Sequence, residues 1–105
     1  MTVSVELHRT FKVQGLTSEQ LDAHTDELMD ALLRLERPGE LCDSSVSADL
    51  GQFIVEIDIV GMGDNFDAAA LVADSAVRAA IHELGGATPG WIVATIAQHT
   101  ELVAA

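Results

Sequence analysis

Residues 46–60 read VSADLGQFIVEIDIV, and this stretch decides the predicted fold. It contains two runs in which apolar and polar side chains alternate, Val46–Leu50 and Phe53–Val60, with Gly51-Gln52 between them. Such alternation is typical of a β-strand with one buried face. A glycine-containing pair between two such runs is typical of a tight hairpin turn. The stretch therefore predicts two antiparallel strands at the centre of the chain.

The segments on either side of this hairpin complete a symmetric pattern. An alternating run, Val3–Val13, and a helical stretch, Thr17–Arg37, precede it. A second helical stretch, Asp64–Leu84, and a strand-like run, Trp91–Gln98, follow it. This β-α-β-β-α-β order resembles the split β-α-β arrangement of ferredoxin-like domains. With right-handed crossovers, it predicts a single α+β domain over residues 1–105, with a four-stranded antiparallel sheet of order 4-1-3-2 and both helices on one face.

Local signals predict several element boundaries and helix faces. Thr17 followed by Gln20 matches a capping box at the start of the first helix. The segment Leu41–Ser45 is expected to be a connecting loop, and Gly61 is expected to end the third strand. Phe66 and the alanines that follow it are expected to face the sheet, which indicates a close approach of the second helix.

The composition limits the classes of partner. The 105-residue chain has 17 Asp and Glu against five Lys and Arg, a net charge of −12. Nucleic-acid binding needs clustered cations, and an anionic membrane would repel the domain for the same reason, so we expect neither partner. The single cysteine, Cys42, allows no internal disulfide and no multi-cysteine metal site. Because the sequence shows no secretory signal and no apolar stretch of roughly 18 residues, the expected location is the cytoplasm.

The strongest candidate for chemistry is a histidine on the polar face of the first strand. His8 lies there, and Glu56 and Asp58 lie on the corresponding face of the third strand, its expected neighbour. A histidine facing a carboxylate can be a general base with its orienting acid, or a cross-strand charge pair that holds a sheet together. We favour the charge pair, and expect the imidazole to titrate near its reference pKa of about 6.5. No metal-ligand spacing or cofactor motif accompanies these residues, so we expect neither a metal nor a cofactor.

Two further charged positions depart from simple patterns. Arg9 interrupts the apolar face of the first strand. Asp74 and Arg78, four residues apart in the second helix, are expected to form an ion pair on its exposed side.

The last strand is apolar on both faces. Ile92, Ala94 and Ile96 alternate with Trp91, Val93, Thr95 and Ala97. Strands apolar on both sides are usually covered on both, whereas helices cover only one side of a ferredoxin-like sheet. The sequence therefore predicts an interface for a second copy of the chain on the open side of the sheet, with four residues in it: Ile54, Trp91, Val93 and Thr95.

Three functions of different classes fit these observations. The favoured one is a non-catalytic binding or regulatory module that forms a homodimer through its open sheet face and that could bind a small molecule. The second is a small dimeric αβ-barrel-type enzyme that uses His8, Glu56 and Asp58. The third is an acidic protein that binds a basic partner or mimics a nucleic acid, with the acids of the first helix as its surface: Glu19, Asp22, Asp26, Glu27 and Asp30.

Overall fold

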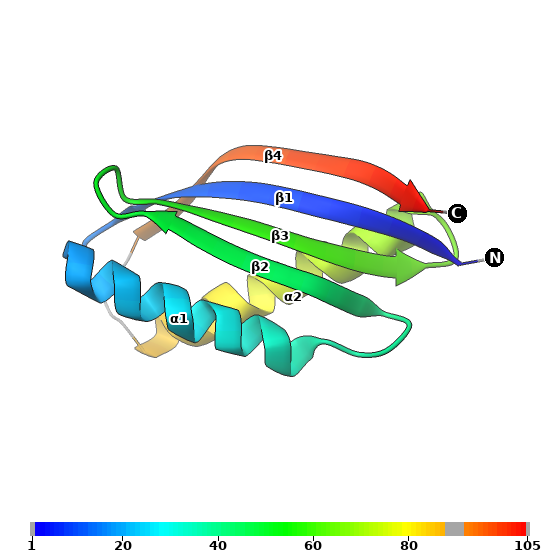
Figure 1. The fold of residues 1–105 in the computed structure, drawn as a ribbon, viewed down its shortest axis with the longest axis horizontal. Helices are drawn as coiled ribbons and strands as arrows, with labels where there is room; N and C mark the ends of the chain where they lie inside the picture. The colour runs from blue at the N-terminus through cyan, green and yellow to red at the C-terminus, as the bar shows by residue number, and fades with distance from the viewer. Residues whose placement is uncertain (1, 88–91, 105) are drawn as a thin grey trace.

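A computed structural model describes residues 2–87 and 92–104 of the chain. The elements follow in the order β1 (Val3–Gln14), α1 (Ser18–Leu35), β2 (Leu41–Asp49), β3 (Ile54–Gly63), α2 (Phe66–Ala87) and β4 (Ile92–Ala104) (Figure 1). Within this part of the chain, neither helix combines the length and apolar character needed to span a bilayer.

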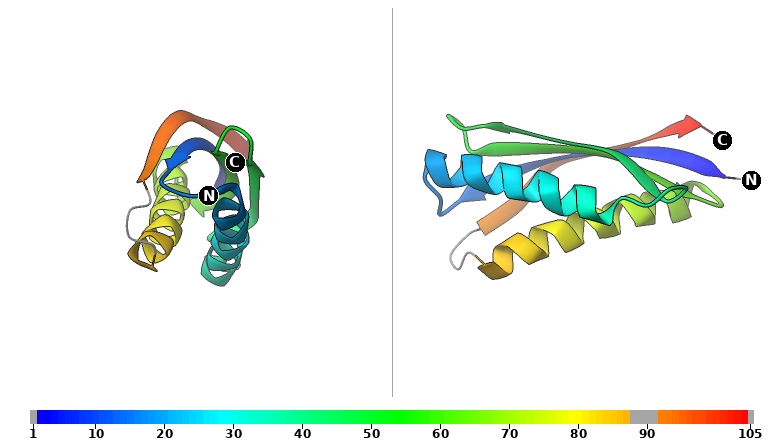
Figure 2. Two further views of the ribbon diagram at one scale, coloured as in Figure 1. Left: turned by 90° about the vertical axis from the view of Figure 1, so that its left-hand side faces the viewer. Right: turned by 60° about the horizontal axis from the view of Figure 1, so that its bottom comes forward.

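The four strands form one antiparallel sheet in the order β2-β3-β1-β4. The two helices lie side by side on the same face of this sheet (Figure 2). Read from β4, the order is 4-1-3-2, so the predicted α+β ferredoxin-like fold is confirmed. We call the other face of the sheet, which neither helix covers, the open face.

Several element boundaries follow from local hydrogen bonds. The side chain of Thr17 accepts a bond from the backbone of Gln20, whose side chain accepts one from the backbone of Thr17, so the capping box is confirmed. In the central hairpin, the carboxylate of Asp49 accepts bonds from the backbone N–H groups of Gly51 and Gln52. These contacts satisfy backbone donors that a helix start and a turn would otherwise leave unpaired.

The expected loop at Leu41–Ser45 is wrong, because these residues are the first half of β2. Leu41 is buried and pairs with Gly61, so β3 also continues past the glycine that was expected to end it. A register shift between Cys42 and Ser45, with Asp43 at a φ of +54°, interrupts the pairing without ending it. A bulge of this kind hides a strand from a search for strict alternation.

The core fills the space between the sheet and the two helices. Its larger side chains come from odd-numbered positions of β1 and β3 and from the inner faces of the helices: Val5, Leu7, Phe11, Val13, Leu21, Leu28, Leu32, Val55, Ile57, Ile59 and Val77. Phe66, expected in this core, is 42 % exposed at the start of α2.

Glycine in β3 allows α2 to lie against the sheet. A Cβ built on Gly61 would meet the backbone nitrogen of Ala73 at 2.9 Å and the carbonyl oxygen of Ala69 at a still shorter distance. Both alanines are fully buried. The expected close approach is therefore correct for this part of the helix, and Gly61 is required by space rather than by its backbone conformation.

Substitution of this glycine should destabilise the domain. We expect Gly61→Ala to lower the free energy of unfolding by about 3 kcal/mol, because the added methyl group must push α2 away from β3. Gly51→Ala is the matched control, since its Cβ would meet only the Asp49 carboxylate at an ordinary 3.4 Å. Urea denaturation should show a change under about 1 kcal/mol for the control, and equal effects in the two variants would contradict this account.

Candidate functional site

The structure brings His8 and Asp58 together on the open face. The two residues are directly paired across β1 and β3, and His8 Nδ1 lies 2.5 Å from Asp58 Oδ1. On its other side, His8 Nε2 lies 3.4 Å from Thr10 Oγ1. Both His8 and Asp58 are half-buried. Glu56, the third predicted member, pairs with Thr10 one row along the sheet and makes no hydrogen bond to His8.

The hydrogen bond that His8 Nδ1 donates to Asp58 raises the pKa of His8 above its ordinary value of 6.5. Partial burial acts in the opposite direction, while the negative charges of Asp58, Glu56 and Glu6 add to the increase. The expectation of an unperturbed imidazole is therefore wrong. The raised pKa and the short contact of His8 Nδ1 with Asp58 Oδ1 are both the features of a cross-strand charge pair.

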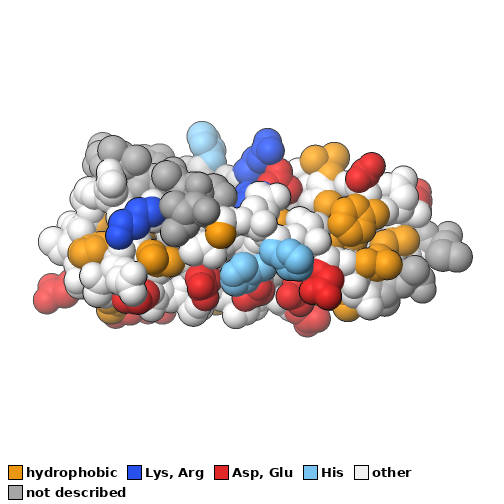
Figure 3. Space-filling view, turned by 90° about the horizontal axis from the view of Figure 1, so that it is seen from above, with side chains coloured by type: hydrophobic (Ala, Val, Ile, Leu, Met, Phe, Trp, Pro, Cys, Tyr) orange, Lys and Arg blue, Asp and Glu red, His pale blue; other side chains and the backbone are white. Residues whose placement is uncertain are grey.

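A row of polar residues crosses the open face at this point. Pairing of neighbouring strands places Ser45, Asp58, His8 and His99 in line across all four strands. Figure 3 shows two histidine side chains next to each other near the middle of this face, with acidic side chains beside them. Within residues 2–87 and 92–104, no group of three His, Cys, Asp or Glu side chains is arranged to hold a metal ion.

The pH dependence of stability tests the His8–Asp58 pair. Because the folded-state pKa of His8 is raised, the pair's contribution is fully present below pH about 6.5 and is lost as the pH rises through the raised value. We expect Asp58→Asn to lower the free energy of unfolding by up to about 1 kcal/mol near pH 5.5 and by clearly less near pH 8.5, with both groups partly solvated. Urea denaturation at the two pH values measures this, and a larger loss at the higher pH would contradict it.

A second cluster, around Arg9, lies on the helix side of the sheet. The Arg9 side chain is 8 % exposed. Its Nε donates to Gln98 Oε1 at 3.0 Å, and its Nη2 donates to Asp74 Oδ1. The other carboxylate oxygen of Asp74 lies 2.8 Å from Arg78 Nε. Asp74 thus joins a buried arginine to an exposed one.

The sequence-based placement of Asp74 on the solvent side of α2 is wrong. Its side chain is 17 % exposed, because α2 turns this position toward β1, where Arg9 needs an opposite charge. The ion pair between Asp74 and Arg78 is confirmed. The sequence did contain one signal for the contact between Arg9 and Asp74. Arg9 interrupts the apolar face of β1, and a buried guanidinium requires a carboxylate nearby.

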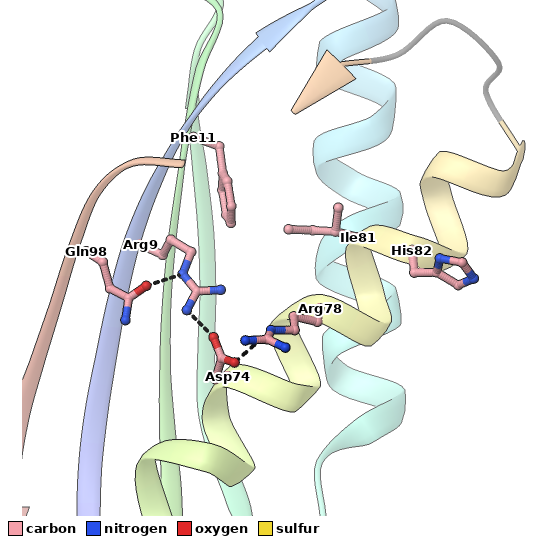
Figure 4. A pocket seen from close by; sticks show the side chains of 7 residues that line it. All are labelled: Arg9, Phe11, Asp74, Arg78, Ile81, His82 and Gln98. Carbon is pink, nitrogen blue, oxygen red and sulfur yellow. Dashed lines mark hydrogen bonds and ion pairs between the residues drawn. The ribbon is translucent and has the colours of Figure 1, made fainter. Parts of the chain in front are cut away.

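A hollow of about 660 Å³ adjoins this cluster, between α2 and the strands β1 and β4 (Figure 4). It is lined by Arg9, Phe11, Asp74, Arg78, Ile81, His82 and Gln98. The guanidinium carbon of Arg9 lies 6.0 Å from the centre of the Phe11 ring. The hollow therefore combines two apolar side chains, Phe11 and Ile81, with five polar or charged ones, of which two are arginines.

A smaller hollow of about 400 Å³ lies on the open face beside the central hairpin. It is lined by Ser47, Ala48, Asp49, Gln52, Ile54 and Glu56, so it contains one residue of the predicted interface, Ile54.

The other predicted interface residues stay predictions. Trp91 lies outside the described residues. In the backbone register, Val93 pairs with Val13 and Thr95 pairs with Phe11, after a shift between Thr10 and Phe11.

Comparisons with known proteins identify no relative of this chain. No family model matches it, and no curated protein matches it. Among solved structures, a de novo designed protein, Foldit4, is 13 % identical, with coverage of 95 % of this chain and 96 % of that chain and a TM-score of 0.44. An amidase of the hydantoinase/carbamoylase family from Burkholderia phymatum is 15 % identical, with coverage of 98 % and 28 % and a TM-score of 0.43. A NIPSNAP family protein from Agrobacterium tumefaciens is 14 % identical, with coverage of 95 % and 90 % and a TM-score of 0.38. Likenesses at this level give no information on activity.

The two arginines that contact Asp74 should contribute very differently to the free energy of unfolding. Asp74→Ala leaves the Arg9 guanidinium buried without its counter-charge, and we expect a loss of about 3 kcal/mol in the free energy of unfolding. Arg78→Ala should cost less than about 1 kcal/mol, because this side chain is 76 % exposed. Combining Asp74→Ala with Arg9→Met should recover about half of the loss. Urea denaturation of the three variants measures this, and a double variant less stable than Asp74→Ala would contradict the account.

Proposed function

We propose that this domain is a non-catalytic binding module that forms a homodimer through the open face of its sheet. One observation carries the proposal: both helices lie on the same side of the sheet, and apolar side chains also occur on the opposite side (Figures 1 and 3). Apolar surface that a monomer would leave in water is the usual mark of an interface, and twofold pairing is the commonest way to cover it.

The apolar residues lie toward both ends of the open face. At one end, Val60 is already buried, while Cys42, which pairs with it, and Met62, two residues further along β3, are partly exposed. At the other end, Ile54 contributes to the wall of the 400 Å³ hollow. A second copy would bury Ile54 and Met62 further and could insert a side chain into this hollow, which supports the choice of a second copy as the occupant.

The polar middle of the face fits an interface better than a catalytic centre. The enzyme hypothesis is favoured by one observation, the 2.5 Å contact of His8 with Asp58. However, His8 lines neither the 660 Å³ hollow nor the 400 Å³ hollow, so no described cavity would hold a substrate beside it. Burial, together with Asp43 and Glu36, also raises the pKa of the Cys42 thiol, which makes it a weak nucleophile. We therefore propose the binding module ahead of the enzyme.

The oligomeric state tests the proposal directly. Sedimentation velocity at micromolar concentration should give twice the chain mass of 11.1 kDa. Ile54→Lys places a charge in the proposed interface and should give a folded monomer, as judged by an unchanged circular dichroism spectrum. Leu71→Lys is the matched control, because Leu71 is an apolar residue on α2 that is 63 % exposed, and it should leave the dimer intact. A wild-type mass near that of one chain would refute the proposal.

A further inference from the structure

The hollow beside α2 concentrates positive charge in a chain that has little of it. The protein has only five Lys and Arg against 17 Asp and Glu. Two of those five, Arg9 and Arg78, line this hollow, and Asp74 is the single carboxylate in its described wall. The local balance of these three groups is positive, opposite in sign to the protein as a whole. Such a site attracts anions although the whole chain repels them.

Two hydrogen bonds fix the orientation of the Arg9 guanidinium. Nε is fixed by Gln98 and Nη2 by Asp74, while Nη1 has no hydrogen-bond partner among the described residues. In Figure 4 this third nitrogen points into the space between Phe11, Ile81 and Arg78. A buried, already oriented guanidinium loses little conformational freedom when it binds a carboxylate.

The walls on either side of this nitrogen are apolar. Phe11 comes from β1 and Ile81 from α2, and they flank the entrance to Arg9 (Figure 4). The volume of about 660 Å³ is in the range of small-molecule sites. From the charge, the Nη1 donor that no described residue pairs and the apolar side chains of Phe11 and Ile81, we infer that this hollow binds a small organic anion, a carboxylate on a flat apolar body, with the carboxylate between Arg9 and Arg78.

This site is independent of the proposed homodimer. The hollow lies on the helix side of the sheet and the proposed interface lies on the open face, so each can exist without the other. Loss of one property by a variant of the other surface would contradict this independence.

Benzoate is the probe that tests the inference, and benzamide is its uncharged counterpart of the same shape. Titration of the labelled protein, followed by NMR, should give saturable shifts at the Arg9 Nε–Hε group and at Ile81, with benzoate affinity in the millimolar range. Benzamide should bind at least about fivefold more weakly. Equal binding of the two probes, or shifts that do not saturate, would overturn the inference.

Two arginine variants distinguish benzoate binding in the hollow from a general effect of the protein's net charge. Arg78→Gln should weaken benzoate binding about fivefold, as expected for a partly solvated ion pair. Arg34→Gln removes the same charge from α1, where Arg34 pairs with Glu83 and lines no part of the hollow, and should change binding by less than about twofold. Equal effects of the two variants would overturn the inference.

Asp74→Asn should strengthen benzoate binding, the opposite of the effect expected for Arg78→Gln. It removes the carboxylate that competes with the ligand, so benzoate should bind about fivefold more tightly than to the wild type. Added benzoate should also raise the Tm of this variant more than that of the wild type, because the probe restores the missing negative charge beside Arg9. Weaker binding by folded Asp74→Asn would overturn the inference, and the Arg78→Gln and Arg34→Gln pair decides it if this variant does not fold.

Discussion

The close packing of α2 on the centre of the sheet is the constraint on which the rest of the structure depends. The helix packs on β3 and β1, while α1 packs on β2. Gly61 and the small side chains of Ala69 and Ala73 make this approach sterically possible. Because α2 is drawn toward β3, space remains between the helix and β4, and the 660 Å³ hollow occupies it. The glycine in β3 thus contributes to the position of a hollow that lies between α2 and the strands β1 and β4.

A buried charge then fixes how α2 is oriented. Arg9 lies on the inner face of β1, and its guanidinium cannot stay buried without an anion. Asp74 satisfies this requirement only if α2 presents that position to β1, so the ion pair selects one rotation of the helix about its axis. An apolar pair at the same place could be equally stable. The charged pair adds specificity of packing, and it leaves one guanidinium nitrogen directed at the hollow.

The sequence was sufficient for the fold but not for the helix-side site. Strand alternation, the Gly51 turn and the Thr17 cap are local signals, and each predicted its element correctly. The start of β2 was missed because the bulge at Asp43 breaks the alternation. On the open face, strand neighbours predicted the contact of His8 with Asp58, since register follows from topology. The link between Arg9 and Asp74 joins residues 65 positions apart through the rotation of a helix, which no local pattern contains.

Strand β1 connects the two proposed surfaces, because adjacent residues of a strand point to opposite faces. His8 contributes to the open face through Asp58, and Arg9 contributes to the hollow through Asp74. A slip of one residue in the pairing of β1 would exchange them, placing His8 against α2 and a guanidinium on the proposed dimer interface. The buried ion pair opposes this slip from one side and the His8–Asp58 pair opposes it from the other. The register of a central strand therefore keeps the anion-binding chemistry on the helix side and away from the face proposed for dimerisation.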